Sequence, residues 1–106
     1  MSDLNSILFE GAVAGEPVIA GQGKEKHCSF ILANRRYRRE GGESKIRTTR
    51  MRIVAHDAKM AELIVRCAYA GRMARVVGCT AEDEAGIYIA AEHIEYKPEL
   101  NGGKKE

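Results

Sequence analysis

Alternating apolar and polar residues in the first half of the chain predict three β-strands. Residues 7–13 form the first, residues 27–37 the second and residues 47–56 the third. Between the first two strands, residues 15–23 contain Pro17 and three glycines, which predicts a turn-rich connection with at most a short extended piece. Gly41 and Gly42 break the pattern between the second and third strands, which predicts a hairpin.

The two faces of the hairpin strands differ in character. In the second strand Cys28, Phe30 and Leu32 share one apolar face. The third strand turns one face to the predicted core: Thr49, Met51, Ile53 and Ala55. Its other face, which we expect to meet solvent or a ligand, carries Thr48, Arg50, Arg52, Val54 and His56.

The second half of the chain predicts a helix followed by two strands. Asp57 can N-cap a helix over residues 58–70, which Gly71 would end. Apolar residues recur in it at helical spacing: Met60, Leu63, Ile64 and Cys67. Valine-rich residues 74–79 and residues 87–96, separated by an acidic turn, predict the last two strands. Residues 1–97 then form one domain, and residues 98–106 are predicted to be a flexible tail.

Three strands, one helix and two more strands is the element order of an OB-fold. This fold is a five-stranded, partly open Greek-key barrel whose middle strands present a face that binds oligonucleotides. The sequence therefore predicts an all-β protein with one helix, placed between strands three and four.

Positive charge is concentrated in the predicted hairpin, although the whole 106-residue chain has a formal charge of only +2. Eight cations lie there: Arg35, Arg36, Arg38, Arg39, Lys45, Arg47, Arg50 and Arg52. Only Glu40 and Glu43 oppose them, and Tyr37 lies in the middle of the first cluster. Phosphates attract cations and bases stack on flat rings, so this mixture favours a single-stranded nucleic acid. The alternative is a hairpin that only makes the surface soluble.

Other classes of function find little support. Cys28, Cys67 and Cys79 are odd in number and widely spaced, which predicts reduced thiols in a cytoplasmic protein without a disulfide or metal site. The three histidines have no ligand spacing, and no nucleophile or phosphate-loop motif is present. We expect no enzyme activity and no cofactor. The opening residues do not resemble a signal peptide, and no apolar run is long enough to cross a membrane.

Short strings along the chain resemble the DNA-binding domain of bacterial single-stranded DNA-binding proteins. They occur in the family's order, from Leu4 to about Pro98. The strings cover residues 5–11, 28–30, 33–37, 52–56, 61–62, 71–72, 75–78 and 91–96, and residues 34–37 read Asn-Arg-Arg-Tyr. The resemblance implies an OB-fold that self-associates, usually as a homotetramer, and binds single-stranded DNA during replication, repair and recombination.

The chain also departs from the family. It has no tryptophan, Arg50 stands at the strand-three aromatic position, and His56 replaces the aromatic at the end of that strand. The connection between Cys79 and Ile87 is short and acidic where the family has a long basic hairpin with an aromatic. The glycine- and proline-rich tail with an acidic end, which recruits partners in the family, is not recognisable. The chain is therefore expected to be either a short, divergent member or one whose tail was removed, and to bind less tightly.

The predicted DNA-binding residues have different expected roles. Tyr37 is the base-stacking platform, and the arginines with Lys45 contact phosphates, although strand alternation prevents all of them from facing one ligand. The guanidinium planes of Arg50 and Arg52, on the outer face of the third strand, can either pair with phosphate or stack on bases. For His56, base stacking and ordinary surface placement remain equally open. Tyr69, Tyr88 and Tyr96 are expected to pack, so Tyr37→Ala should cost more affinity than Tyr88→Ala.

Two function classes and one mode of assembly remain as hypotheses. The first class is general single-stranded DNA binding; the second is an assembly module of the primosomal replication protein N type, or a regulatory subunit, acting mainly through protein contacts. Strand one is predicted to be an edge strand, and edge strands commonly pair with a second copy. Such an edge predicts a dimer, and the resemblance implies that dimers pack further into a tetramer, the assembly we expect first. No membrane partner is expected.

Overall fold

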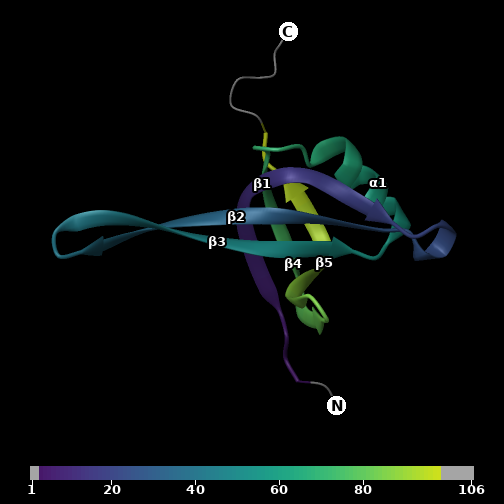
Figure 1. The fold of residues 1–106 in the computed structure, drawn as a ribbon, viewed down its shortest axis with the longest axis horizontal. Helices are drawn as coiled ribbons and strands as arrows, with labels where there is room; N and C mark the ends of the chain where they lie inside the picture. The colour runs from purple at the N-terminus through teal and green to yellow at the C-terminus, as the bar shows by residue number, and fades with distance from the viewer. Residues whose placement is uncertain (1–2, 99–106) are drawn as a thin grey trace, which may run out of the picture.

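The computed structural model describes residues 3–98, and its strands close into a single barrel in the order β1-β2-β3-β5-β4 (Figure 1). The elements are β1 (Ile7–Ala20), the short 3₁₀ helix η1 (Gly23–Glu25), β2 (His27–Glu40), β3 (Glu43–Ala55), α1 (Ala58–Cys67), β4 (Met73–Asp83) and β5 (Gly86–Tyr96). The helix lies between β3 and β4, so the predicted OB-fold is confirmed. Within these residues no helix has the length and apolar character needed to cross a membrane.

Strand β1 is twice as long as predicted, because the chain passes through its glycine and proline without leaving the sheet. Ile7–Ala12 pairs with β4, and Ala12–Ala20 pairs with β2. The register with β2 shifts between Ala14 and Val18, where Gly15 adopts a φ of +87°. Such a bulge bends the strand and accommodates Pro17, which has no N–H for the ladder. The connection expected over residues 15–20 is therefore wrong, apart from the short extended piece at Val18–Ile19, which is part of the strand.

The β2–β3 hairpin is also longer than predicted and projects well past the barrel (Figure 1). Its pairing is continuous from Cys28 opposite Ala55 to Glu40 opposite Glu43. Gly41 and Gly42, with φ angles of +58° and +84°, form the two-residue turn. Two positive φ angles suit the right-handed twist of the strands, so this Gly-Gly pair allows a tight hairpin with no extra loop.

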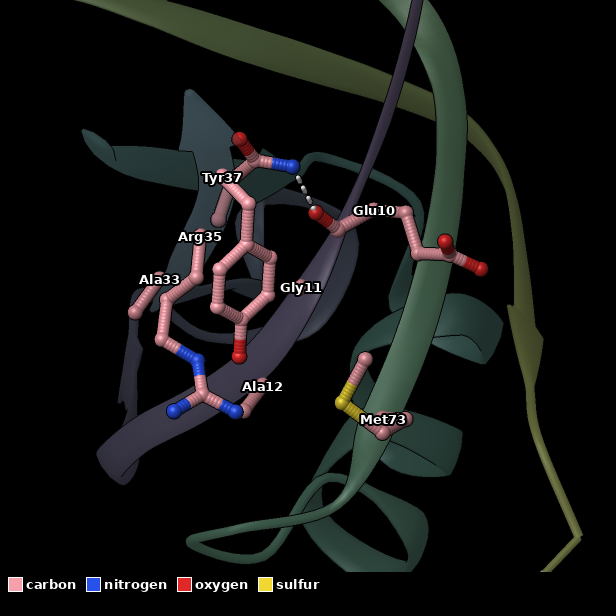
Figure 2. A pocket seen from close by; sticks show the side chains of 8 residues that line it. Glu10, Gly11, Ala12, Ala33, Arg35, Tyr37 and Met73 are labelled. Atoms are coloured by element: carbon pink, nitrogen blue, oxygen red, sulfur yellow. Dashed lines mark hydrogen bonds between the residues drawn. The ribbon is translucent and has the colours of Figure 1, made fainter. Parts of the chain in front are cut away.

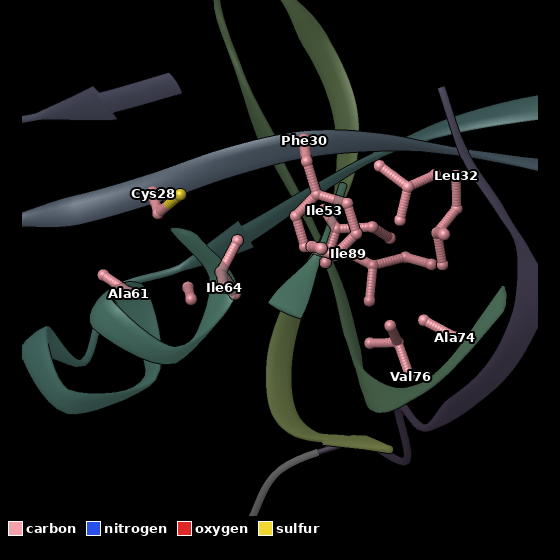
Figure 3. Packing of buried hydrophobic residues seen from close by; sticks show 12 residues of the cluster. Cys28, Phe30, Leu32, Ile53, Ala61, Ile64, Ala74, Val76 and Ile89 are labelled. Carbon is pink, nitrogen blue, oxygen red and sulfur yellow. The ribbon is translucent and has the colours of Figure 1, made fainter. Parts of the chain in front are cut away.

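The core lies inside the barrel and beneath α1 (Figure 3). Its buried residues are Val13, Cys28, Phe30, Leu32, Ile53, Ala55, Ala61, Ile64, Ala68, Ala74, Val76 and Ile89. The predicted N-cap is confirmed, since the Asp57 carboxylate accepts a hydrogen bond from the Lys59 N–H. Leu63, however, is half exposed, and the helix ends at Cys67, before the predicted Ala70. The chain leaves the helix there because the Gly71 N–H bonds to the Val13 carbonyl of β1.

Two residues of β3 have environments opposite to those predicted. Val54 was expected on the solvent face but is only 6% exposed, because β2 and β5 flank it, with Ser29 and Ala90 as its partners. Thr49 was expected to face the core but is exposed. It lies where the hairpin has already passed the end of the barrel, so the apolar face of β3 has nothing left to cover.

Candidate nucleic-acid interface

The β2–β3 register divides the predicted site residues between two faces of the hairpin. Directly opposed residues of an antiparallel pair lie on the same face. The face that continues the barrel's outer surface, here called the outer face, carries Arg35, Tyr37, Arg39, Arg50 and Arg52. The opposite face, here called the inner face, carries Arg36, Arg38, Lys45 and Arg47. The cations thus lie on two surfaces, as strand alternation implied.

On the inner face the positive charge is partly neutralised. The Glu40 carboxylate lies 3.9 Å from Arg38 Nε, 3.7 Å from Lys45 Nζ and 3.8 Å from Arg47 Nη2. These are long, exposed ion pairs, each contributing at most about 1 kcal/mol to stability. A shallow hollow of about 250 Å³ lies beside them, lined by Arg36, Arg38, Arg47 and Thr49. This face can attract an anion, but it already holds a competing carboxylate.

On the outer face Tyr37 is 70% exposed, although it belongs to a well-paired strand. Its cross-strand partner Ile46 is also exposed, so the tip of this face is an apolar surface among cations. A buried aromatic would stabilise the fold; an exposed ring offers its π-face to a ligand instead.

Tyr37 and Arg35 lean from β2 toward β1, above a small pocket of about 140 Å³ (Figure 2). Small residues of β1 and β2, among them Gly11 and Ala33, line this pocket. A Cβ atom on Gly11 would fall 2.4 Å from the Ala33 carbonyl oxygen, so only glycine permits this approach of the two strands. The Asn34 side-chain amide donates a 2.7 Å hydrogen bond to the Glu10 carbonyl and fixes the crossing. The pocket below Tyr37 is therefore narrow, and its base is formed by two strands that are held close together.

Three arginines of the outer face carry no ion pair with any other described residue: Arg35, Arg39 and Arg50. All three lie in the exposed or half-exposed part of the hairpin. Guanidinium groups free of an internal carboxylate can bind external phosphate oxygens without first breaking a contact.

Arg52 differs from these three because it is bound to an acidic residue of β4. Its Nη1 donates to Asp83 Oδ2 at 3.0 Å and its Nη2 donates to Asp83 Oδ1 at 2.6 Å. A third hydrogen bond, of 3.3 Å, reaches the Gly86 carbonyl. The hydrogen bonds to Arg52 hold the pKa of Asp83 below its usual range, and those to Asp83 raise the pKa of Arg52. Arg52, predicted to pair with phosphate or to stack on a base, thus also ties β3 to the β4–β5 turn.

An aromatic side chain that the sequence did not assign to the site, Tyr88, lies beside Arg52. Its guanidinium carbon lies 4.7 Å from the centre of the Tyr88 ring. The His56 ring meets Tyr88 edge-on, with 6.3 Å between centres, and His27 lies 6.1 Å from His56. Tyr88 does pack, as expected, but against two predicted site residues. The parallel pairing of Ile53 with Ile89 explains this, because it brings Arg52 and Tyr88 onto the same outer surface.

The other two tyrosines lie outside this surface. Tyr69 and Tyr96 both contact the Arg72 guanidinium, with 5.4 and 5.6 Å to their ring centres. Burial raises the pKa of Tyr96 to about 12. Among residues 3–98, no three histidine, cysteine or acidic side chains gather in a way that could hold a metal ion.

No protein-family model matches the chain, and no curated protein sequence resembles it closely enough to count as a relative. Solved structures do resemble it. A Plasmodium falciparum SSB in complex with ssDNA is 25% identical with a TM-score of 0.77, covering 92% of this chain and 97% of that one.

Two bacterial structures share the fold. A small single-stranded DNA-binding protein from Streptomyces coelicolor is 20% identical with a TM-score of 0.71, covering 92% of this chain and 96% of that one. A deletion mutant of the single-stranded DNA binding protein from Thermus aquaticus is 16% identical with a TM-score of 0.76. The match covers 92% of this chain but only 52% of the Thermus aquaticus chain. The barrel order and these likenesses confirm the predicted fold: the chain has an OB-fold, and its structure resembles those of single-stranded DNA-binding proteins.

Proposed function

We propose that this protein binds single-stranded DNA, without strong sequence preference, along the outer face of the β2–β3 hairpin. The observation that carries the proposal is the exposed Tyr37 ring, which shares its face with three arginines that form no ion pair with another residue of the range 3–98: Arg35, Arg39 and Arg50. The similar Plasmodium falciparum protein was solved in complex with ssDNA, which supports the same ligand class here.

The chemistry of this face favours a single strand over a duplex. Arginines neutralise backbone phosphates and release counterions, which gives affinity without reading sequence. Tyr37 offers a stacking surface that any base can use, but only an unpaired base exposes its own π-face. A duplex keeps its bases stacked inside and gains only the charge attraction.

Binding is expected to be weaker than in aromatic-rich relatives. Each base stack contributes roughly 1–3 kcal/mol, and Tyr37 is the exposed aromatic residue on the hairpin. The short β4–β5 turn over residues 83–86 carries Asp83 and Glu84 near the same face, where negative charge opposes phosphate.

A titration of fluorescently labelled oligothymidine against a duplex of equal length tests the function. Log affinity for the single strand should fall linearly with log salt, by about 0.7 per phosphate contacted, and the single strand should bind more tightly than the duplex. Equal affinity for both at moderate salt would reduce the interaction to charge attraction. Absence of binding would instead favour the assembly-module hypothesis, which the acidic turn beside Arg52 also suits.

We also propose that two copies pair through the first half of β1. The ladder partner of Ile7–Gly11 is β4, on one side of the strand, and no described strand pairs with its other side. Leu8 on this segment is 65% exposed. An unpaired strand edge with an exposed apolar side chain favours pairing with a second copy. The sequence predicted that the whole first strand would be an edge strand. In the structure only its first half has a free edge, because its second half pairs with β2.

Light scattering at micromolar concentration tests the assembly. A dimer or tetramer is the expected result, and either brings several outer faces onto one particle, which raises the effective concentration for a single strand that touches two of them. A monomer would contradict this part of the proposal. Protection of single strands during replication, repair and recombination would follow from such binding and is proposed on that basis.

A further inference from the structure

We propose that Arg52 is a base-stacking platform and not a phosphate contact, and that Asp83 is the positioning residue that holds it flat against Tyr88. This inference rests on the proposed single-strand binding and adds a second stacking site to the same face. It concerns a cluster on three strands: Arg52 on β3, Asp83 on β4 and Tyr88 on β5.

The geometry fixes the plane of the guanidinium. Two hydrogen bonds join both of its terminal nitrogens to both Asp83 oxygens, at 3.0 and 2.6 Å, and such a two-point contact leaves the group little freedom to rotate. The bond to the Gly86 carbonyl adds a third anchor, and the Ala85 N–H in turn fixes Asp83 by donating to its Oδ1 at 2.9 Å. An arginine that served phosphate would need these donors free.

The same contacts leave a surface for a base. Tyr88 covers one side of the guanidinium, with 4.7 Å between the guanidinium carbon and the ring centre. The Arg52 side chain keeps 27% of its surface exposed although both of its terminal nitrogens donate hydrogen bonds. A planar guanidinium, backed by a ring and neutralised by a carboxylate, stacks on bases much as an aromatic side chain does.

The position of this cluster on the outer face makes the second platform useful. Tyr37 and Arg52 lie on the same face of the hairpin. Arg52 is paired with Ile31, which lies six residues before Tyr37 along β2. At the usual rise this separates them by about 20 Å, a span of several nucleotides. Arg35 and Arg50 lie between them. The face would then offer a stack at each end and phosphate contacts in the middle.

Two substitutions separate stacking from phosphate binding. In Arg52→Lys the charge remains but the plane is lost, so oligothymidine affinity should fall roughly 5- to 150-fold while the slope of log affinity against log salt stays unchanged. In Asp83→Asn the guanidinium loses its anchor, and affinity should also fall although a negative charge has been removed. Glu84→Gln, which removes the neighbouring negative charge without touching Arg52, is the matched control and should raise affinity slightly.

The alternatives give different results. If Arg52 is a phosphate contact held back by Asp83, Asp83→Asn will bind more tightly than Glu84→Gln and with a steeper salt slope. If the cluster only stabilises the β4–β5 turn, both variants will unfold at lower temperature but bind like the wild type below that temperature. Either outcome overturns the proposal. Failure of the wild type to bind in the same titration would instead overturn the proposed function itself.

Discussion

Replacing Tyr37 with alanine is expected to weaken single-stranded DNA binding by roughly 5- to 150-fold. The ring is 70% exposed and supports no core packing, so its removal should cost the stacking free energy of about 1–3 kcal/mol and leave the fold intact. Tyr37→Phe keeps the ring and loses only the hydroxyl, and should bind within about twofold of the wild type. The measurement is fluorescence anisotropy with oligothymidine at fixed salt.

Tyr69→Ala is the matched control, since Tyr69 is also a partly exposed tyrosine but contacts Arg72 at the end of α1. It should bind like the wild type. An unchanged affinity for Tyr37→Ala, with an unchanged circular dichroism spectrum, would remove Tyr37 from the binding site.

The largest expected effect comes from removing the three unpaired cations of the outer face together. The triple variant Arg35→Gln, Arg39→Gln, Arg50→Gln loses three phosphate contacts, which should lower the slope of log affinity against log salt by about 2. Near 0.1 M salt this corresponds to a loss of affinity on the order of 100-fold. A salt series of oligothymidine titrations measures both quantities.

The inner face supplies a control with the same change in net charge. The triple variant Arg36→Gln, Arg38→Gln, Arg47→Gln removes three cations from the same two strands, but two of them already lie beside the Glu40 carboxylate. Its affinity and salt slope should change much less. Equal losses in the two triple variants would mean that the hairpin acts as a diffuse positive charge and that the outer face has no special role.

Much of the fold could be predicted because local pattern and global structure agree. The alternation of Cys28, Phe30 and Leu32 predicted the buried face of β2, and Asp57 predicted the start of α1. The extent of β1 could not be predicted, because Gly15 and Pro17 are signals for a turn in local terms. Only the neighbouring β2 ladder, which is distant in sequence, keeps residues 18–20 in the sheet.

The candidate site was predicted less completely than the fold, for the same reason. Charge and aromatic content identified the hairpin, and strand alternation implied that its cations would divide between two faces. The Arg52–Asp83 pair and the contact with Tyr88 depend on which strands become neighbours in the closed barrel. Asp83 and Tyr88 lie 31 and 36 positions after Arg52 in the chain, so no local pattern predicts these contacts. Combining the OB-fold strand order with the parity of β5 would have placed Tyr88 beside Arg52.

Chemical-shift mapping by NMR tests the central claim most directly, because it reports binding and its location in one titration. Unlabelled oligothymidine is added to ¹⁵N-labelled protein, and the backbone amide shifts are followed. The account predicts that the largest changes fall on residues 35–39 and 46–52 of the hairpin, with further changes at Asp83 and Tyr88. Changes confined to α1, or to the β1–β4 surface around Glu10 and Arg75, would contradict it.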